Sequence, residues 1–361
     1  MLSPSGAARG VGQFDRALCA SQFSPVPDLD FQFSRGAVLF PRLGLWLDAR
    51  ESRSGGERVF VSHAHSDHIG RHREVILTPA TARLMAARLG GKRQAHELAL
   101  GETRAFRGPG AGYRLALRGA GHIYGSAMAH VEAEGGSLLY TGDFKLKNGL
   151  AAEICEPCRA DILVMETTFG LPRYIFPPVE EIWAGIIQFC TGAMAGGGTA
   201  VLLAYSLGKS QELLLGLGRA GLPVMLQDQA RKLTRVCAEL GQIFPEHTEL
   251  DVAQAAGKVV ICPPGSPVLA ELREQGRARV AMVTGWAMDS STKYRYGVDA
   301  AFPLSDHADF GELLELVERV QPRLVCTLHG FAAEFAQTLR ERGHDARALG
   351  MQEQLQLALF H

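Results

Sequence analysis

The sequence lacks an apolar run of the length that a membrane span requires, which is about 20 residues. Its N-terminus also lacks the basic start, apolar core and cleavage site of a secretion signal. The seven cysteines are an odd number, and most lie in apolar stretches rather than in a framework of loops (Cys190, Cys237, Cys262, Cys326). These absences argue against a membrane-spanning protein and a disulfide-stapled secreted one, and they predict a cytoplasmic protein.

An excess of charge of either sign is also missing. The 37 lysines and arginines balance 38 acidic residues, so the formal net charge is −1. Proteins that bind nucleic acid usually carry a basic surface. If this chain binds nucleic acid, its basic surface has to be local.

Two short motifs are incomplete. Cys155 and Cys158 form a lone CxxC pair, whereas a structural zinc needs four ligands, so we interpret this segment as an ordinary loop. The stretch that ends in Gly208-Lys209-Ser210 has Leu203 where a phosphate-binding GxxxxGK[ST] loop has its first glycine. The sequence therefore predicts no use of a nucleoside triphosphate.

What the chain does contain is a dense group of metal-ligand residues. The apolar run 59–61 leads into the loop 62–68 (SHAHSDH), which holds three histidines and a carboxylate within six residues. Imidazole nitrogens and carboxylate oxygens are ligands that zinc prefers. On an extended segment His63 and His65 point to the same side, and Asp67 and His68 follow where the chain turns toward a second ion. We predict a metal site here; the alternative is a surface loop that is rich in histidine by chance.

Three later strands end on further candidate ligands. His122 follows the run 115–118 in a glycine-rich turn, Asp143 follows the apolar run 137–140, and His329 ends the run 323–328. A lone histidine or aspartate at a strand end is more often structural than a ligand. Three of them after a complete HxHxDH loop favour a site for two metal ions.

These motifs resemble a known family. HAHSDH, GHIYGSA, YTGDF and the late LHG are similar, in order, to the metal-binding motifs of the metallo-β-lactamase superfamily, and METTFG and LSDHADF resemble extra motifs of its β-CASP nuclease branch. Within that branch, ETTFGLPRYIFPP, AYSLGKSQ and GWAM most resemble the bacterial ligase-associated DNA exonucleases, also described as mRNA 3′-end processing factor-like proteins. The resemblance extends from about Asp30 to Leu349.

The resemblance implies a ligand set, with Zn²⁺ as the expected metal and Mn²⁺ as the alternative. One ion would be held by four residues (His63, His65, His122, Asp143) and the other by a second four (Asp67, His68, Asp143, His329). Asp143 would bridge the two ions. Asp48 would accept a hydrogen bond from a ligand histidine and fix its tautomer; the alternative is a turn carboxylate that closes a hairpin.

The resemblance also implies a mechanism. Two divalent ions about 3.5–4 Å apart can activate a shared water and clamp a phosphate for in-line attack, with Asp67 counted among the catalytic residues. His307 is the candidate general acid, and Glu166 would hydrogen-bond it and raise its pKa. Ser305 or Asp306 is expected to cap the helix that begins at this point. The alternative for His307 is a histidine of the capping region with no catalytic role.

The order of elements predicts an α/β protein, and the resemblance specifies a metallo-β-lactamase αββα sandwich with an inserted β-CASP domain. Between residues 199 and 284, four strands alternate with three helices, which implies a parallel sheet flanked by helices. The expected divisions are a flexible leader (1–27), the first part of the metallo-β-lactamase domain (28–177), the β-CASP domain (178–290) and the completing part of the metallo-β-lactamase domain (291–361).

Basic and hydroxyl residues near these motifs are candidates for binding phosphate. Ser206, Lys209 and Ser210 lie at a strand-to-helix junction, where free N–H groups can hold an anion. Arg173 and Lys293 lie next to metal-site motifs, and four more basic residues flank the ligands (Arg71, Arg73, Lys145, Lys147). The alternative is ordinary helix capping and solvated surface.

The leading hypothesis is a metal-dependent exonuclease that trims DNA in DNA repair, and the resemblance alone implies association with a DNA ligase or helicase. The alternative is an RNA-processing nuclease of the β-CASP type, which a histidine at position 329 favours. A small-molecule metallohydrolase, such as a thioesterase or lactonase, is disfavoured because its substrates need no long inserted groove. The complete ligand set argues against an inactive scaffold.

Overall fold

The computed structural model describes residues 29–34 and 36–350. The flexible leader predicted for residues 1–27 lies outside this range. Within it, no helix is both long and apolar enough to cross a membrane.

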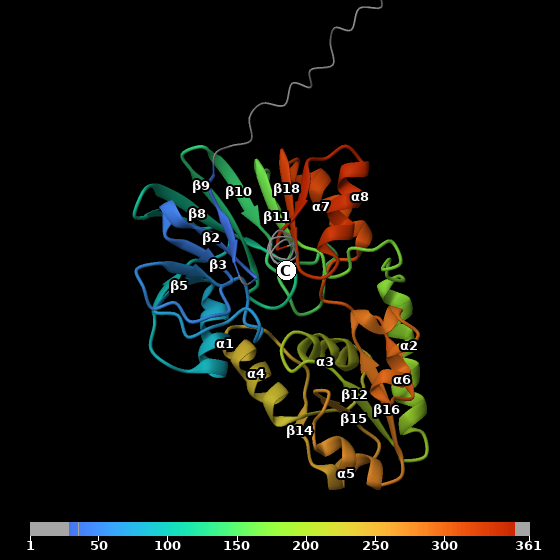
Figure 1. Cartoon of the computed structure of the whole chain (residues 1–361). Helices are drawn as coiled ribbons and strands as arrows, with labels where there is room; N and C mark the ends of the chain where they lie inside the picture. Colours follow the sequence, from blue (N-terminus) through green and yellow to red (C-terminus); the bar gives the residue numbers. More distant parts are fainter. Residues whose placement is uncertain (1–28, 35, 351–361) are drawn as a thin grey trace, which may run out of the picture.

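The described strands form three sheets (Figure 1). The first has the order β1-β2-β3-β4-β5-β6. Its strands are β1 (Gln32–Ser34), β2 (Ala37–Phe40), β3 (Leu45–Leu47), β4 (Arg58–Phe60), β5 (Glu74–Leu77) and β6 (Gln94–Glu97). The second has the order β19-β18-β11-β10-β9-β8-β7. Its strands are β7 (Thr103–Arg107), β8 (Gly112–Gly119), β9 (Ala127–Ala133), β10 (Gly136–Tyr140), β11 (Ile162–Glu166), β18 (Leu324–Leu328) and β19 (Ala346–Ala348).

The third sheet is parallel throughout and has the order β14-β13-β15-β12-β16-β17. Its strands are β12 (Thr199–Leu203), β13 (Val224–Leu226), β14 (Thr248–Glu249), β15 (Val259–Cys262), β16 (Ala278–Val283) and β17 (Ala300–Phe302). The described helices are α1 (Pro79–Leu89), α2 (Val179–Met194), α3 (Lys209–Arg219), α4 (Asp228–Glu239), α5 (Val268–Glu274), α6 (Thr292–Tyr296), α7 (Phe310–Val320) and α8 (Ala332–Glu341). Short 3-10 turns cover Pro41–Leu43, Val252–Gln254 and Gly285–Met288.

The first two sheets pack face to face. Side chains that alternate along their strands meet in one core, for example Phe40 and Phe60 of the first sheet with Leu117 and Tyr140 of the second. Helix α1 covers the outer face of the first sheet, where Met85 packs with Val75. Helices α7 and α8 cover the outer face of the second sheet. These four layers confirm the predicted αββα sandwich (Figure 1).

The third sheet belongs to the insert, and helices cover both of its faces. Helices α2 and α3 pack on one face, through residues such as Ile186 and Leu213. Helix α5 packs on the other through Leu272. Because both faces are buried, the strands read as continuous apolar runs, of which 199–203 (TAVLL) is an example. This confirms the predicted parallel sheet flanked by helices.

Two sequence expectations need correction. Strand β17 pairs with β16, so the insert's sheet extends to Phe302, beyond the division expected at residue 290. The helix after His307 begins at Phe310 and is capped by Asp309, whose carboxylate accepts from the backbone N–H of Glu312 at 2.9 Å. The prediction of Ser305 or Asp306 as its cap is wrong because the Ser305 hydroxyl bonds the backbone of His307 in a local turn instead.

The sandwich and the insert meet through a small apolar cluster. Ala64 and Ile123, from two of the metal-site loops, pack with Leu207 and Leu233 of the insert. Helix α1 lies against α4, and Arg83 pairs with Glu239 at 2.8 Å. This contact places the start of α3 beside the loop that carries His63 and His65.

Candidate metal centre and active-site cleft

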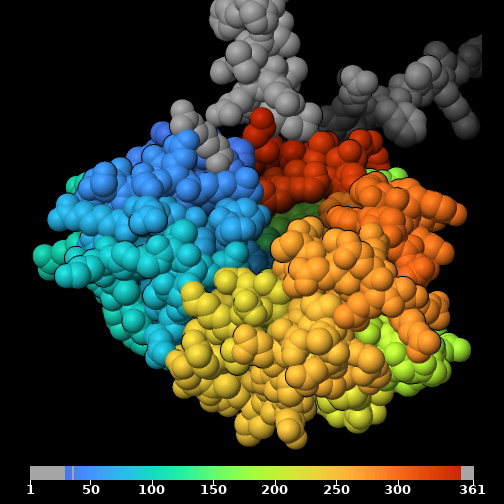
Figure 2. Space-filling model, turned by 90° about the horizontal axis from the view of Figure 1, so that it is seen from below, coloured from blue at the N-terminus to red at the C-terminus, as the bar shows by residue number. Residues whose placement is uncertain are grey.

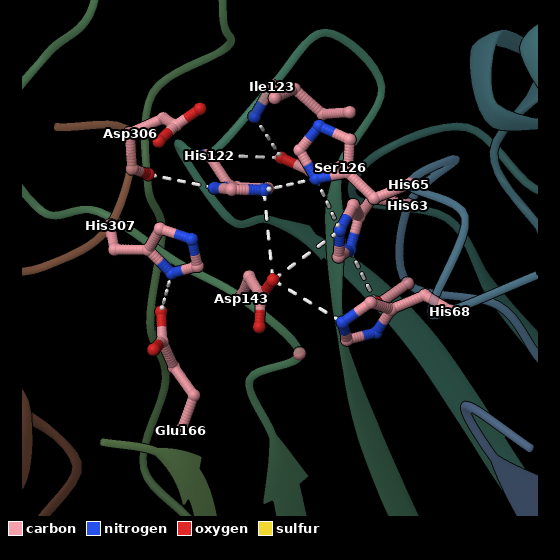
Figure 3. Close-up of polar contacts among 12 residues, drawn as sticks. His63, His65, His68, His122, Ile123, Ser126, Asp143, Glu166, Asp306 and His307 are labelled. Atoms are coloured by element: carbon pink, nitrogen blue, oxygen red, sulfur yellow. Dashed lines mark hydrogen bonds and ion pairs between the residues drawn. The ribbon is translucent and has the colours of Figure 1, made fainter. Parts of the chain in front are cut away.

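The predicted site residues lie at one end of the sandwich, where strands of both inner sheets end. The chain leaves β4 into the loop of His63 and His65, β10 toward Asp143, and β18 toward His329. Glu166 is the last residue of β11. Strands β10, β11 and β18 are parallel neighbours, so their carboxyl ends meet at the same edge. Figure 3 shows His63, His65, His68, His122 and Asp143 pointing toward a shared space.

The first predicted ligand set converges closely. Nε2 of His63 and Nε2 of His122 each lie 3.1 Å from Nδ1 of His65. One oxygen of Asp143 lies 3.5 Å from Nε2 of His63 and 3.8 Å from Nε2 of His122. One ligand atom from each of the four side chains falls within 4.8 Å of the others. Nitrogens that converge in this way fit a small divalent cation.

The other ring nitrogens of these histidines have partners of their own. Nε2 of His65 donates to the carbonyl of Leu207 at 3.2 Å, and Nδ1 of His122 donates to the carbonyl of Asp306 at 2.8 Å. Nδ1 of His63 lies 2.9 Å from the Ser62 hydroxyl. An outward N–H leaves the inward nitrogen as a lone pair, which is the arrangement that metal-binding histidines show. The donor set therefore fits a divalent metal.

Burial keeps most of these histidines neutral. It lowers the pKa of His63 well below the usual value, lowers the pKa of His65 to about 4, and lowers the pKa of His122 as well. His68 differs. Burial acts to lower its pKa, but the carboxylates of Asp143 and Asp48 outweigh burial and hold the pKa well above the ordinary value. A neutral imidazole is the form that binds a metal.

The second predicted ligand set is more open. Nε2 of His68 lies 3.3 Å from Asp143 and 3.8 Å from Asp67. The His329 ring lies farther away, with its centroid 6.1 Å from that of His68. The Asp67 side chain is 58% exposed. All four residues line the same cleft, but within the described residues they do not form a group as tight as the first set.

Asp48 anchors both parts of the histidine loop from beneath. Its carboxylate accepts from Nδ1 of His68 at 2.9 Å and from the Ser62 hydroxyl at 2.6 Å, and that hydroxyl also contacts His63. The hydroxyl of Tyr140 donates to it at 3.0 Å. Sequence analysis missed Ser62 and Tyr140, although both lie inside the quoted motifs. Gly142 permits this packing, because a Cβ there would lie 2.5 Å from Cβ of Ser62.

His307 and Glu166 form a separate pair beside the ligands. Nδ1 of His307 lies 2.8 Å from a Glu166 oxygen, and the ring centroid lies 4.7 Å from that of His122. Glu166 is 1% exposed and also accepts from the backbone N–H groups of Phe144 and Thr168, at 3.1 Å each. Burial acts to lower the pKa of His307, but the charges of Glu166 and Asp143 raise it to about 10. His307 is therefore protonated near neutral pH and faces the cleft (Figure 3).

The residues predicted to bind phosphate are placed differently from one another. Ser206 lines the cleft. Lys209 does not reach it: the side chain is 1% exposed and lies 3.3 Å from Glu212 and 3.6 Å from Asp306. Ser210 is buried, and its hydroxyl donates to the carbonyl of Tyr205. For Lys209 and Ser210 the prediction is wrong, because their polar groups are satisfied inside the protein.

The other basic candidates also lie away from the cleft. Arg173 is exposed above the rings of Tyr174 and Phe331, and Lys293 is exposed on α6. Neither belongs to the described residues that line the cleft. Lys145 is buried and donates to the carbonyl of Ser305 at 2.7 Å, and Lys147 pairs with Asp309 at 2.7 Å. Both lysines therefore stabilise the fold around His307.

The cleft lies between the sandwich and the insert and has a volume of ≈ 650 Å³. Figure 2 looks into this hollow, with the first segments of the sandwich on one side and the insert on the other. The lining residues to which the sequence analysis assigned no role include Arg50, Arg88 and Tyr205. Arg50 follows Asp48 closely and Tyr205 is the second residue of the AYSLGKSQ motif, whereas Arg88 carries no signal in the sequence.

Known proteins resemble this chain in sequence and in fold. Residues 300–349 match the family described as a Zn-dependent metallo-hydrolase RNA specificity domain. The chain is 52% identical over 331 residues to a probable DNA ligase of Opitutus terrae, which covers 91% of this chain and 32% of that protein. It is 27% identical over 186 residues to an RNase J-like protein of Methanocaldococcus jannaschii, which covers 44% of this chain and 42% of that protein. A crystal structure from Enterococcus faecalis V583, of a protein of unknown function, superposes with a TM-score of 0.55 at 11% identity, over 81% of this chain and 79% of that chain.

An αββα sandwich with convergent histidines at the ends of its strands has the architecture of a metal-dependent hydrolase. With these similarities, the chain belongs to the β-CASP branch of the metallo-β-lactamase superfamily. It spans less than half the length of the two curated relatives named here.

Proposed function

We propose that the chain is a two-metal phosphodiesterase that acts as a DNA exonuclease in DNA repair, with Zn²⁺ as the metal. The observation that carries the proposal is the convergence of His63, His65, His122 and Asp143 within 4.8 Å, next to the hydrogen-bonded pair of His307 and Glu166. Ligands for a cation and a proton donor on the same cleft are what the cleavage of a phosphodiester requires.

The ligand roles follow the two sets described above. The close set would hold one ion, and the open set (Asp67, His68, Asp143, His329) would hold the other, with Asp143 shared. When bound, the ions would supply activation of water and neutralisation of charge on the phosphate. Asp48 fixes His68 directly, and it fixes His63 through Ser62, so both rings stay in the orientation that ligation needs.

His307 is the proposed general acid. Glu166 holds Nδ1 at 2.8 Å, so that Nε2 remains as the proton donor toward the cleft. The leaving oxygen of a phosphodiester carries developing negative charge, and a proton from Nε2 would neutralise it. Glu166 is itself fixed by two backbone N–H groups, so the pair is preorganised for this transfer.

DNA is the proposed substrate because of the Opitutus terrae relative. At 52% identity it contains a counterpart of nearly this whole chain within a protein named as a probable DNA ligase. The match covers 32% of that protein, which leaves room for ligase domains on the same polypeptide. An exonuclease linked to a ligase would prepare DNA ends for sealing, so we propose a DNA ligase as the functional partner. We also propose a cytoplasmic location, which the six free cysteines of the described chain support.

RNA processing is the second candidate. The family match at residues 300–349 is described as an RNA specificity domain, and one relative is named RNase J-like. The same active site would serve, because the chemistry at phosphorus is shared by the two polymers.

The test uses matched DNA and RNA strands, each labelled at one end, with Zn²⁺ or Mn²⁺ added and EDTA as the control. We expect metal-dependent shortening of DNA, and the position of the label then gives the polarity. Preferential cleavage of RNA would move the protein to the second candidate. Cleavage of neither strand by the metal-loaded protein would overturn the nuclease proposal.

A further inference from the structure

We propose that the cleft holds a single strand of nucleic acid, with Tyr205 as the platform on which a base next to the scissile phosphate stacks and with Arg88 and Arg50 binding the neighbouring phosphates. This inference rests on the proposed nuclease function and assigns the substrate contacts of the same site. It replaces Lys209 and Ser210 as the residues of this junction that meet the substrate.

Tyr205 presents an aromatic face from a rigid backbone. Tyr205 is 52% exposed as a residue and lines the cleft. Its carbonyl accepts from the backbone N–H of Ser210 at 3.1 Å and from the Ser210 hydroxyl at 2.7 Å. Two residues later, Leu207 is 1% exposed and its carbonyl accepts from His65. The backbone that carries the ring is therefore fixed relative to the metal ligands, while the ring itself stays open to the cleft.

Exposure of a single tyrosine is ordinary by itself, so the assignment of Tyr205 as a binding residue depends on its surroundings. Tyr205 lines the cleft together with Asp67, a proposed ligand, and with Asp306, whose carbonyl accepts from the proposed ligand His122. A base that lies on this ring would place its own phosphate near the ligands. Stacking on aromatic rings is how proteins bind unpaired bases without regard to sequence.

Arg88 supplies positive charge on the sandwich side of the cleft. It lies in the last turn of α1, is partly buried, and forms no ion pair with any residue from 29 to 34 or from 36 to 350. Arg88 lines the cleft together with the proposed ligands Asp67 and His68. A guanidinium that is partly withdrawn from water without a carboxylate of its own is suited to an anionic ligand.

Arg50 adds a second guanidinium to the same cleft. It is exposed, lines the cleft together with Arg88, and likewise has no ion pair within the described part of the chain. These two residues supply local positive charge to a chain whose net charge is −1. Phosphates would therefore lie toward the arginines, and bases toward Tyr205 of the insert.

This arrangement selects for an unpaired strand. In a duplex each base is stacked and paired, so its face is not available to a protein ring unless the strands separate or the base flips out. The proposed platform needs one free base face beside the reacting phosphate. We therefore expect single strands, or frayed and overhanging ends, to bind more tightly than blunt duplex.

The test measures binding of a short fluorescent oligonucleotide by anisotropy, with metal present. All proteins carry His307→Ala, which slows cleavage of the probe. Tyr205→Ala is expected to weaken binding about 5- to 150-fold, the range found for the loss of one stacked base, whereas Tyr205→Phe keeps the affinity. Tyr294→Ala is the matched control, because this tyrosine is 84% exposed on α6 and does not line the cleft. Metal content and melting temperature should be unchanged in all three.

A second experiment tests whether the Tyr205 ring contacts a base. A set of oligonucleotides with one abasic position each identifies the base whose loss weakens wild-type binding most. Against that oligonucleotide Tyr205→Ala should have no further effect, since the two changes remove the same contact. For Arg88→Met we expect weaker binding and a salt dependence that is reduced by about one unit of slope, with the exposed Arg219→Met as the control.

The outcomes separate the two proposals. Equal binding by Tyr205→Ala and Tyr205→Phe, or equal affinity for blunt duplex and single strand, would overturn the platform while cleavage by the wild-type protein still supports the nuclease. The same Tyr205 dependence with RNA and not with DNA would keep the platform and change the substrate. A wild-type protein that neither binds nor cleaves any oligonucleotide would overturn both.

Discussion

Two polar turns meet at the cleft, each after a buried parallel strand, and they use their side chains in opposite ways. After β4, His63 and His65 direct ring nitrogens at one point, where nitrogens of two rings lie 3.1 Å apart. After β12, Lys209, Ser210 and Gln211 turn into the protein and are buried. From the second turn, what faces the cleft is the segment Tyr205–Leu207.

The difference lies in how each turn satisfies its polar groups. In the second turn the three buried polar side chains have partners: Lys209 has Glu212 and Asp306, Ser210 has the Tyr205 carbonyl, and Gln211 has Thr234. In the first turn the inward nitrogens face one another and Asp143, an arrangement that only a shared cation or protons can satisfy. Convergent lone pairs therefore mark a ligand site, whereas satisfied polar groups mark structure.

The largest effect should follow from Asp143→Ala. This carboxylate belongs to both proposed ligand sets, so its removal should release bound metal and reduce phosphodiester cleavage below detection. Elemental analysis of the purified protein and the end-label assay measure the two losses. Asp30→Ala, at an exposed position, is the control. Full metal content and activity in Asp143→Ala would contradict the assignment of the first turn.

His307→Ala should reduce cleavage about 100- to 10,000-fold, the contribution of a positioned proton donor, while the metal content stays unchanged. The rate constant at saturating oligonucleotide is the measurement, and His344→Ala is the histidine control. A thioesterase or lactonase has no need of this acid. An unchanged rate of oligonucleotide cleavage would contradict the assignment of His307 as the general acid.

Lys209→Met tests the second turn. The change leaves Glu212 and Asp306 buried without their cation, which should cost about 3–5 kcal/mol in the free energy of unfolding. Urea denaturation measures this loss, and the exposed Lys293→Met should stay within about 0.5 kcal/mol of the wild type. A stable Lys209→Met protein with weakened binding of nucleic acid would instead restore Lys209 as a phosphate ligand.

The smallest effect is expected from Glu166→Gln. Burial acts to lower the pKa of His307, and the charge of Glu166 is the main influence that raises it to about 10. A general acid works while it is protonated, so activity is lost as the pH rises through this pKa. The glutamine keeps an acceptor but removes the charge, so the alkaline limb of the pH–rate profile should move to lower pH. An unmoved limb would mean that another group sets it.

The order of the strands and helices could be predicted because the formation of each element depends mainly on residues close to one another in the sequence. The alternation of strands and helices after residue 199 was predicted from apolar runs such as 199–203, which the structure forms as β12. His63 and His65 lie on one side, as the period of an extended segment requires. Two elements that were not predicted, α6 and β14, are five and two residues long and carry little periodic signal.

The predictions that were wrong concern residues whose contacts lie far away in the chain or depend on the local backbone turn. Nothing near Lys209 indicates that Asp306, almost a hundred positions later, draws it inward. The cap of α7 depends on a choice between Ser305 and Asp309, which the backbone turn at His307 decides. The backbone of His329 has φ of 60°, a left-handed conformation that the preceding strand does not announce.

The hydrogen bond from His65 to the carbonyl of Leu207 has a consequence for assembly. His65 offers Nδ1 to a metal in the neutral tautomer that carries its proton on Nε2. The carbonyl that accepts this N–H belongs to Leu207 of the insert. Coupling between two binding equilibria is reciprocal. If docking of the insert on the sandwich raises the affinity for metal, bound metal must raise the affinity of the sandwich for the insert by the same free energy. Chelation should therefore loosen the junction between α1 and α4, and hydrogen exchange at Arg83 and Glu239 would detect it.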